Sequence, residues 1–415
     1  MRIGYFVNAF PSLSETFILN QIIGTIQRGH EVIIHADRPN PDPPKIHADV
    51  ERYGLIERTR YREPVPFRRV VRLRRALAGI ARWGWRHPSC VLDSLNYFRH
   101  GRQALNLSVL NSWLPENETA EGYDVIHCHF GPNGQRTVAM RLVGALRGPI
   151  ITTFHGYDAN LLPRIHGRKI YTQLFRHGDL FTVGSEFMRR RILSLEAPAE
   201  RIVNMPMGVD VTRYLSLEDR RSDNGEFRLL TIARLVEVKG IEYVLRALAL
   251  LKRKRPRLRY CIAGDGPLRT KLEALTTELG LAPMVEFLGA VSQEEALKLY
   301  EAAHGFVLPS VVTESGEEEN QPVVLAEAQA SGLPVIATAI GGIPESMCDG
   351  ESGLLVPQRN AEALASAILW LTDHPESWSR MGRAGRKFVK KHFDLDGLND
   401  QLVDLYRAVI AHAKL

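Results

Sequence analysis

The stretch Phe227-Arg-Leu-Leu-Thr-Ile-Ala-Arg234-Leu-Val-Glu-Val-Lys239-Gly240 contains the pattern on which the fold prediction rests. Its first part, Phe227–Ile232, is strand-like, and a helical pattern begins after Gly240. Arg234 and Lys239 lie between the expected strand and the expected helix. A strand, a turn and a helix form one β-α unit, and a series of such units predicts a parallel sheet covered by helices.

The same alternation continues on both sides of this stretch and forms two series. The strand-like runs of the first series are Arg2–Val7, Glu31–Ala36, Tyr123–His129, Pro149–Phe154 and Leu180–Val183. Those of the second series are Phe227–Ile232, Leu258–Ala263, Val285–Leu288, Gly305–Leu308 and Pro334–Ala337. Between the series, the polar run Ser216–Glu226 contains Asp-Asn-Gly, which is typical of a linker. We predict an α/β protein with doubly wound domains at residues 1–215 and 227–390 and a helix at 391–415 that returns to the first domain.

Residues 39–122 interrupt the first domain and carry the excess of positive charge. The net charge is +6, yet the segment from Arg58 to Arg102 alone holds 12 arginines against Glu63 and Asp93. One localised basic patch indicates a localised anionic partner, and it argues against a general nucleic-acid partner.

The middle of this insertion has the period of an amphipathic helix. Apolar residues recur at helical spacing between arginines and end in two tryptophans: Phe67, Val70, Leu73, Leu77, Ile80, Trp83 and Trp85. One interpretation is a helix that docks on an anionic membrane surface. The alternative is that the stripe packs against the first domain and its arginines are only solvated.

Composition and cysteine spacing exclude several classes of protein. The 45% hydrophobic and 24% charged residues are typical of a globular chain rather than a disordered one. Cys90, Cys128, Cys261 and Cys348 form no Cys-x-x-Cys pair, which favours a reducing compartment. The first apolar run is too short for a signal peptide, and no run reaches the roughly 18 apolar residues of a membrane span. We therefore expect a cytoplasmic protein.

Two turns after expected strands have residue types that suit a phosphorylated ligand. Arg234 and Lys239 precede a helix start, where backbone N–H groups and the helix dipole attract the same anion as the two side chains. Solvated surface cations are the alternative. Gly264-Asp-Gly266 follows another strand, and such a turn allows close approach of a backbone to a ligand, although similar turns are common.

Glu319 and Glu327 are separated by about two helical turns, with Pro322 at a favoured helix-start position. Two carboxylates on one side of a helix start can accept hydrogen bonds from several sugar hydroxyls. The neighbouring Glu317 and Glu318 are expected to be solvated.

The run Glu319–Glu327 resembles the E-x7-E motif of retaining GT-B glycosyltransferases that use nucleotide sugars to build exopolysaccharide and lipopolysaccharide. Phe10–Leu19 resembles the amino-terminal signature of the colanic-acid and capsule branch of that family. Further motifs occur in the family's order, at His127–Gly131, Thr153–Asp158, Gly184–Met188, Gly208–Asp210, Arg234–Gly240, Gly264–Pro267 and Gly341–Glu345.

The resemblance implies a GT-B fold, with two Rossmann-like domains facing across a cleft. It also implies transfer of a sugar from a nucleoside-diphosphate donor to a glycan or lipid-linked glycan acceptor, with retained configuration and without a metal cofactor. The catalytic residues would be His155, Arg234, Lys239 and Glu319. Donor contacts would come from Arg234, Lys239, Gly264, Gly266, Glu319, Asn320, Val323 and Glu327, and acceptor contacts from Ser14, Glu15 and His129.

The resemblance further assigns roles within this set. Arg234 and Lys239 would hold the donor diphosphate, Glu327 would bind the ribose diol, and Glu319 and His155 would face the transferred sugar. From the residues alone, a structural core histidine is the favoured interpretation of His155. His127 and His129 lie on one face of a strand and could form a metal pair, but acceptor lining or strand packing is the favoured interpretation.

One departure from the family pattern affects the expected donor. The residue after the first glutamate is usually glycine in the family, whereas here it is Asn320. Asparagine tolerates a left-handed backbone better than most residues, so we expect the turn to be kept. Two other functions stay open: a GT-B nucleotide-sugar epimerase, and a non-catalytic glycan- or lipid-binding module of the same fold.

Overall fold

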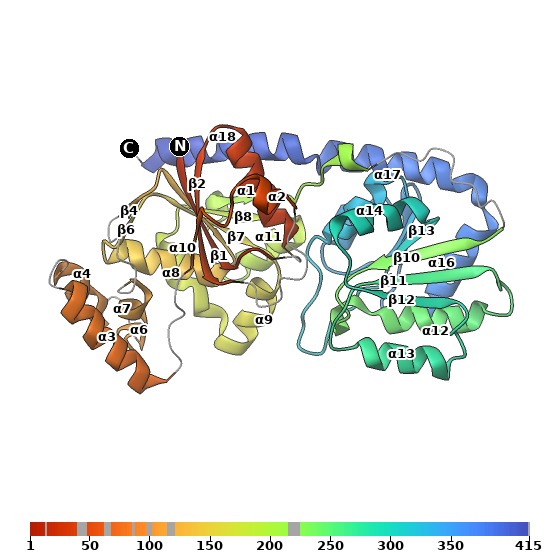
Figure 1. Ribbon diagram of the computed structural model, residues 1–415, viewed down its shortest axis with the longest axis horizontal. Helices are drawn as coiled ribbons and strands as arrows, with labels where there is room; N and C mark the ends of the chain where they lie inside the picture. The colour runs from red at the N-terminus through yellow and green to blue at the C-terminus, as the bar shows by residue number, and fades with distance from the viewer. Residues whose placement is uncertain are drawn as a thin grey trace. The chain divides into compact units, whose positions relative to one another are not determined.

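The computed structural model describes residues 1–12, 15–39, 48–61, 68–84, 88–97, 102–113, 121–214 and 225–413. The chain forms two compact units, each built around one parallel sheet (Figure 1). The first unit comprises Met1–Val183, Arg191–Asn204 and Asn399–Leu415, and the second comprises Gly184–Arg190 and Met205–Leu398.

The first unit contains, among its described residues, a seven-stranded sheet of order β3-β2-β1-β5-β7-β8-β9. All of its pairings are parallel, and buried β1 pairs with β2 on one side and β5 on the other. The strands are β1 Arg2–Ala9, β2 Glu31–Arg38, β3 Thr59–Tyr61, β5 Val125–His129, β7 Ile150–Phe154, β8 Leu180–Val183 and β9 Ile202–Asn204. A separate pair of short strands is formed by β4 Glu121–Gly122 and β6 Leu146–Arg147.

Helices connect these strands, and the insertion contributes a group of its own. The connecting helices are α1 Thr16–Gln27, α2 Ala48–Arg52, α8 Gly131–Leu142, α9 Tyr157–His166, α10 Thr172–His177 and α11 Glu186–Leu193. The insertion forms α3 Arg69–Trp83, α4 Pro88–Ser94, α6 Arg102–Leu105 and α7 Ser108–Trp113. In this group α7 contacts α3, α4 and α6 and also α8 of the main body (Figure 1).

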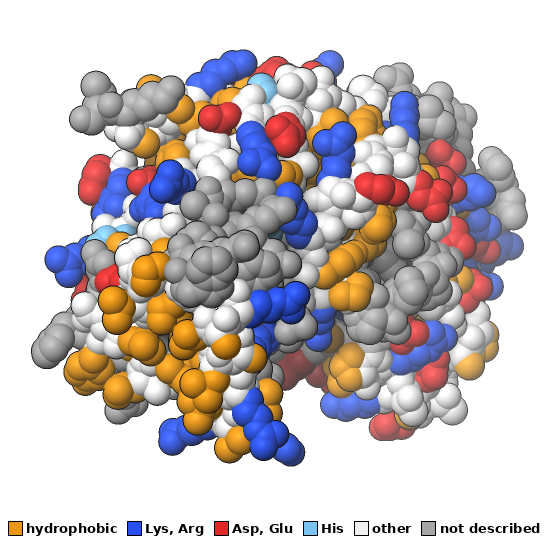
Figure 2. All heavy atoms as spheres, turned by 60° about the vertical axis from the view of Figure 1, so that its left-hand side comes forward, with side chains coloured by type: hydrophobic (Ala, Val, Ile, Leu, Met, Phe, Trp, Pro, Cys, Tyr) orange, Lys and Arg blue, Asp and Glu red, His pale blue; other side chains and the backbone are white. Residues whose placement is uncertain are grey.

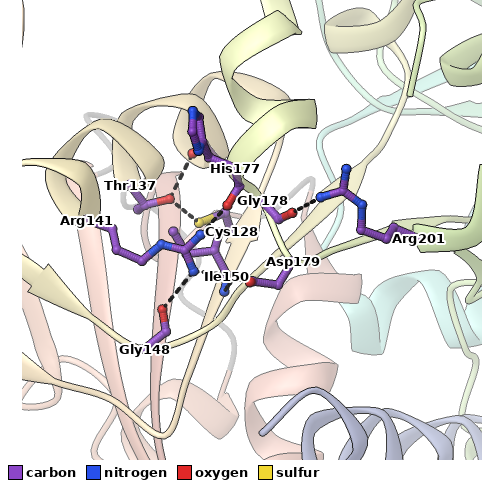
Figure 3. Close-up of polar contacts among 10 residues, drawn as sticks. Cys128, Thr137, Arg141, Gly148, Ile150, His177, Gly178, Asp179 and Arg201 are labelled. Carbon is purple, nitrogen blue, oxygen red and sulfur yellow. Dashed lines mark hydrogen bonds and ion pairs between the residues drawn. The ribbon is translucent and has the colours of Figure 1, made fainter. Parts of the chain in front are cut away.

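Arg141 on α8 stabilises the chain segments near the start of β7. Its guanidinium donates to the Asp179 carboxylate, which also accepts from the Ile150 backbone N–H at 2.7 Å (Figure 3). Next to it, the Arg201 guanidinium donates to the Gly178 carbonyl at 2.7 Å. These charges therefore satisfy backbone groups at the amino-terminal edge of the sheet and serve the fold.

The second unit contains, in its described part, a six-stranded parallel sheet of order β12-β11-β10-β13-β14-β15. Its strands are β10 Phe227–Ile232, β11 Leu258–Ala263, β12 Val285–Gly289, β13 Gly305–Leu308, β14 Val335–Thr338 and β15 Gly353–Val356. Its helices are α12 Ile241–Leu251, α13 Arg269–Glu278, α14 Gln293–Ala302, α15 Val323–Ala330, α16 Ala361–Asp373 and α17 Trp378–His392. The last helix of the chain, α18 Leu395–Ala413, continues into the first unit.

Alternate residues of these strands enter two separate cores. Leu229 and Ile336 pack with α12 and α16, whereas Leu230 and Val335 pack with α15 on the other face. A sheet that is buried on both faces explains why its strands are nearly continuous apolar runs. The predicted doubly wound α/β fold is confirmed for both units.

The structure differs from the prediction at the end of the chain. The helix predicted at 391–415 is not continuous at its start, because α17 ends at His392 and α18 begins at Leu395. The break is stabilised by pairing with a distant segment, because Val209 N–H donates to Phe393 O at 2.8 Å and Leu395 N–H donates to Val209 O at 3.1 Å.

The compact units also divide the chain differently from the predicted ranges. Met205–Tyr214 and Gly184–Arg190 belong to the second unit, although both lie before the predicted boundary at 215. Side chains of the second unit bind the backbone of both segments. The Gln321 amide exchanges two hydrogen bonds with Met207, and the Glu345 carboxylate accepts from the N–H groups of Glu186 and Phe187.

No helix within the described ranges is both long and apolar enough to cross a membrane.

Candidate functional site

In the second unit, the turn after β10 brings two of the predicted site residues to the carboxyl edge of the sheet. Lys239 ends a short 3-10 helix, Glu237–Lys239, and Gly240 follows with a φ of 59°. A side chain at Gly240 would overlap the carbonyl oxygen of Pro309, so this left-handed position requires glycine. Arg234 is exposed, and its guanidinium has no hydrogen-bond or ion-pair partner among the described residues.

Lys239 and Glu319, which are far apart in sequence, meet in this turn. The Lys239 ammonium donates to Glu319 Oε1 at 2.5 Å, and the two side chains are only 14% and 13% exposed. A charge-assisted hydrogen bond between largely buried groups holds both in one geometry. The structure thus brings together a predicted diphosphate-binding residue and a predicted sugar-binding residue.

The predicted glycine turn lies beside the turn that carries Arg234. A side chain at Gly264 would overlap the Ala233 carbonyl, and one at Gly266 would approach the Leu235 backbone closely. Leu235 N–H donates to Asp265 O at 2.9 Å, so the two turns are directly hydrogen-bonded. Close packing of backbone on backbone is therefore a sufficient reason for both glycines.

Asn320 does not have the left-handed backbone that the sequence suggested. It is not among the described non-glycine residues of positive φ, so the turn is kept by another means. The chain here packs against two glycines, since side chains at Gly341 and Gly342 would overlap the carbonyls of Glu319 and Asn320. Ser185 hydroxyl donates to Asn320 Oδ1, and the buried Nδ2 has no hydrogen-bond partner among the described residues.

Glu327 lies in a different environment from Glu319. It is on α15, where its carboxylate accepts a hydrogen bond from the Tyr300 hydroxyl at 3.0 Å. Burial raises the pKa of Glu327 above its ordinary value, and hydrogen bonds from Tyr300 and Tyr214 oppose this shift. Val323, in the first turn of α15, is half-buried and packs against the neighbouring core.

In the first unit, three imidazoles are stacked where β5 and β7 end. The ring centroids of His127 and His129 are 4.6 Å apart, and those of His129 and His155 are 5.2 Å apart. Burial lowers the pKa of His127 and of His155 to about 3, and it holds the pKa of His129 well below its ordinary value. All three rings are therefore neutral near neutral pH.

His155 is held from both its ring and its backbone. Its Nε2 lies 3.0 Å from His129 Nδ1, and the Phe17 and Phe130 rings pack on it with centroid distances of 4.7 Å. The buried Asp158 carboxylate accepts from the His155 backbone N–H at 3.1 Å. The sequence analysis did not select Asp158, although it lies in the same motif, three residues after His155.

The structure contradicts a metal pair at His127 and His129. His127 Nδ1 lies 2.6 Å from the Tyr406 hydroxyl and its Nε2 lies 2.7 Å from the Thr153 hydroxyl, so both nitrogens are engaged. Among the described residues, no group of three or more histidine, cysteine, aspartate or glutamate side chains could hold a metal. His127 thus packs in the core, whereas His129 contacts His155.

The predicted acceptor residues are only partly described. Glu15 stands immediately before α1, at the carboxyl edge of β1, and is half-buried. It acts electrostatically on the Tyr157 hydroxyl, which accepts a hydrogen bond from Asn8 at 3.0 Å. Ser14 lies outside the described residues. Tyr157 and Asn8 were not selected as site residues, although Tyr157 lies in the motif Thr153–Asp158 and Asn8 directly follows the expected strand Arg2–Val7.

Comparison with known proteins identifies the family. The description "Glycosyltransferase Family 4" matches residues 14–213, and "Glycosyl transferases group 1" matches residues 216–388. WcaL of Salmonella typhimurium, named for glycosyl transfer in colanic acid biosynthesis, is 35% identical over 416 residues, covering 99% of this chain and 100% of WcaL. The amylovoran biosynthesis glycosyltransferase AmsK of Erwinia amylovora is 31% identical over 414 residues, covering 98% of this chain and 99% of AmsK.

Solved structures show the same architecture. HepE of Anabaena, in complex with UDP, aligns with a TM-score of 0.70 at 17% identity, covering 98% of this chain and 100% of HepE. Sucrose-phosphate synthase from Thermosynechococcus elongatus aligns with a TM-score of 0.70 at 20% identity, covering 99% of this chain and 100% of that one. With two parallel-sheet units and relatives matched along nearly their whole length, this chain belongs to the GT-B glycosyltransferases of the family that includes WcaL and AmsK.

Proposed function

We propose that this chain is a retaining glycosyltransferase of exopolysaccharide biosynthesis. It transfers a sugar from a nucleoside-diphosphate sugar to a hydroxyl of a glycan or lipid-linked glycan, on the cytoplasmic side of a membrane. The names of WcaL and AmsK support the biosynthetic role, and the UDP in the complex of HepE supports the donor class.

The Lys239–Glu319 ion pair beside exposed Arg234 is the observation that carries this proposal. A diphosphate carries more negative charge than one carboxylate, so a bound donor would compete with Glu319 for the Lys239 ammonium. Binding would then turn Lys239 to the phosphates and free Glu319 to accept hydrogen bonds from the sugar. The pair thus links binding of the diphosphate by Lys239 to release of the Glu319 carboxylate for the sugar.

The reaction follows from this placement of charge. The bond between the anomeric carbon and the phosphate oxygen breaks, the acceptor oxygen bonds to the same face of that carbon, and the leaving phosphate takes the acceptor proton. Negative charge grows on the diphosphate as the bond breaks, so Arg234 and Lys239 stabilise the transition state more than the ground state. This route needs no carboxylate nucleophile.

The remaining predicted residues have supporting roles in this proposal. Glu327, whose carboxylate is oriented by tyrosine hydroxyls, binds the ribose diol. Asn320 offers its unpartnered Nδ2 as a donor close to the sugar site. From the first unit, neutral His155 offers a hydrogen bond to the transferred sugar, and Glu15 and His129 line the acceptor side.

We further propose that transfer requires no metal ion, since two fixed cations are available for the diphosphate. Transfer should be unchanged after treatment with EDTA and unchanged by added Mg²⁺ or Mn²⁺. Loss of activity with EDTA, restored by one of these metals, would contradict this part of the proposal.

A donor panel provides the main test. Calorimetry with UDP-, GDP- and ADP-sugars should show one preferred nucleotide, and that donor should be hydrolysed slowly when no acceptor is present. NMR of the anomeric proton in the product should show the configuration of the donor. Binding without hydrolysis or transfer would indicate a non-catalytic module, and release of an epimerised sugar would indicate an epimerase.

A further inference from the structure

Helix α3 has its apolar side chains on the outside. Val70, Leu73 and Leu77 are 64%, 50% and 59% exposed, whereas Ala76 of the same helix is 2% exposed. In the α-helical period, positions 70, 73 and 77 share one face. The fifteen residues of α3 therefore form an amphipathic helix that turns its apolar stripe away from the rest of its unit.

The inward face of α3 is held by its neighbour α7. The Asn111 amide on α7, which is buried, donates to the Arg72 carbonyl at 3.2 Å. Arg72 and Arg75 lie on the half-buried side of the helix, together with Gly79. The apolar stripe therefore does not pack against the first domain, although Arg68, Arg69 and Arg74 are exposed as that alternative expected.

A second amphipathic helix of the same chain shows the ordinary arrangement. On α12 the apolar positions Ile241, Val244 and Leu248 are buried in the core of the second unit. The chain thus buries the apolar stripe of one helix and exposes that of another. An exposed apolar stripe rimmed by charge marks an interaction surface.

Other helices of the insertion, which like α3 contact α7, also expose apolar side chains. Leu92 on α4 and Leu105 on α6 are 72% and 71% exposed, and Leu95 and Tyr97 are exposed as well. Figure 2 shows hydrophobic side chains gathered on one part of this face, with Lys or Arg side chains beside them. We call the exposed side chains Val70, Val71, Leu73, Leu77, Leu92, Leu95, Tyr97 and Leu105 the insertion patch.

The charge around the insertion patch is predominantly positive. Arg68, Arg69 and Arg74 are exposed at its border, and Asp93 is the one acidic residue in the described ranges 68–84, 88–97 and 102–113. A second copy of the chain placed on the same patch would set arginines against arginines. An anionic lipid surface instead offers phosphates to the arginines and an apolar interior to the leucines.

We propose that the insertion patch docks on an anionic membrane surface. Val70, Leu73 and Leu77 enter the boundary between headgroups and acyl chains, while Arg68, Arg69 and Arg74 bind lipid phosphates. Docking itself depends on these side chains alone, but its benefit, access to a lipid-linked acceptor, rests on the proposed function. Phe67 and Trp85, which the sequence analysis assigned to the same helix, lie outside the described residues, as does the side chain of Trp83.

Vesicle flotation of the full chain tests this proposal. The protein should float with vesicles of phosphatidylcholine mixed with phosphatidylglycerol, and it should stay behind with phosphatidylcholine alone. High salt should release it, because screening weakens the contribution of the arginines. Replacing Arg68, Arg69 and Arg74 by Glu should lower partitioning on the order of 100-fold, given the usual contribution of each basic residue near such a surface.

Matched variants separate the insertion of leucines into the membrane from general effects of a substitution on the protein. The double variant Leu73→Ser with Leu77→Ser should weaken capture by on the order of tenfold per leucine. Leu250→Ser on α12, where an equally exposed leucine lies in the other unit, should leave capture unchanged. Circular dichroism and thermal unfolding should match wild type for all variants, since the altered side chains are exposed.

Three outcomes would overturn the proposal: no flotation with either vesicle, equal flotation with both, or capture that the Glu and Ser variants leave unchanged. Self-association of the free protein that the Leu variants abolish would assign the insertion patch to a second copy instead. Donor hydrolysis in solution, measured on the same variants, should equal that of wild type. Failure of hydrolysis with normal flotation would count against the proposed function alone.

Discussion

The two sheets carry opposite chemistry at their carboxyl edges. In the second unit the edge holds full charges, with Lys239 paired to Glu319 and Arg234 exposed nearby. In the first unit the edge holds His129 and His155, stacked, buried and neutral. Fixed cations suit a diphosphate whose charge grows during a reaction, and neutral rings suit uncharged sugars and hydroxyls. Under the proposed function, the second unit would hold the leaving group and the first unit the neutral ligands.

The largest expected effect tests the charged edge. Lys239→Ala or Arg234→Ala should lower kcat/KM by about 2–4 kcal/mol in transition-state stabilisation, because each removes one preorganised charge. Steady-state kinetics with the preferred donor measures this loss. Arg253→Ala, an exposed arginine in the turn that leads into β11, is the control and should stay near wild type. Wild-type kcat/KM in both site variants would remove the basis for the comparison.

The second prediction separates the roles of the two carboxylates at the charged edge. Glu327→Gln should weaken binding of the free nucleoside diphosphate roughly tenfold, since a neutral amide replaces the proposed acceptor for the ribose diol. Glu319→Gln should not weaken that affinity, because it removes the charge that competes with the diphosphate for Lys239, and it should lower transfer about 100-fold. Calorimetry and steady-state kinetics read the two effects separately.

Equal loss of nucleotide affinity in both variants would falsify this division. Glutamine is used because it can still accept the hydrogen bond that Tyr300 donates to Glu327. Tyr300→Phe serves as the control for any loss of stability at this position.

The third prediction concerns the neutral edge and pH. The pKa of His127 is about 3 in the folded chain and close to 6.5 in the unfolded chain, so the unfolded state binds the proton first as pH falls. The stability that neutral His127 contributes is complete above about pH 6.5 and is lost toward pH 3. At about pH 5 the loss should be roughly 2 kcal/mol.

Denaturant unfolding at about pH 7 and about pH 5 tests this, with His127→Gln as the comparison. The variant lacks the titrating group and should lose about 2 kcal/mol less than wild type between the two pH values. An equal loss in the two proteins would mean that His127 is protonated in the folded state. Over the same pH range, kcat/KM should show no titration of His155, whose pKa is also about 3.

The smallest effect is expected from the scaffold behind the neutral edge. Tyr406 on α18 places its hydroxyl 2.8 Å from the Tyr5 hydroxyl and 2.6 Å from His127 Nδ1. Tyr406→Phe should lower the free energy of unfolding by about 1–2 kcal/mol, because buried polar groups lose a partner. The exposed hydrogen bond from Gln27 to Tyr53 provides the control, and Tyr53→Phe should cost under about 0.5 kcal/mol. Equal losses of unfolding free energy in the two variants would mean that the Tyr406 hydroxyl does not stabilise the packing of α18.

Most of the fold could be predicted because a strand buried on both faces leaves a clear pattern. β8, β10, β11 and β13 have the predicted bounds. In the two large sheets the strands that were missed are β3, β9 and β15, each three or four residues long and each at a sheet edge, and the short pair β4 and β6 was missed as well. Such strands pair on one side only and need few apolar residues, so they leave little periodic signal.

The sequence showed which charged residues follow the strands, but not which of them pair. Local spacing placed Lys239 and Glu319 in separate motifs, and only the packing of the turns after β10 and β13 makes them partners. The neutral state of the histidines was also beyond the sequence, because a pKa depends on what surrounds the ring in three dimensions. Asn320 is a different case. The sequence showed that it replaces the glycine usual in the family, but the sequence did not show its backbone conformation.

By itself, the sequence determined two parallel α/β units, a basic amphipathic helix in an insertion, and a set of charged turns after strands. These features are local, because a period or a turn residue acts within a few neighbours along the chain. Only the tertiary structure decided which face of α3 is exposed, which carboxylate pairs with Lys239, and that Val209 interrupts the last helix. Each of these depends on contacts between segments far apart in the chain, for which hydrophobic period and turn chemistry carry no information.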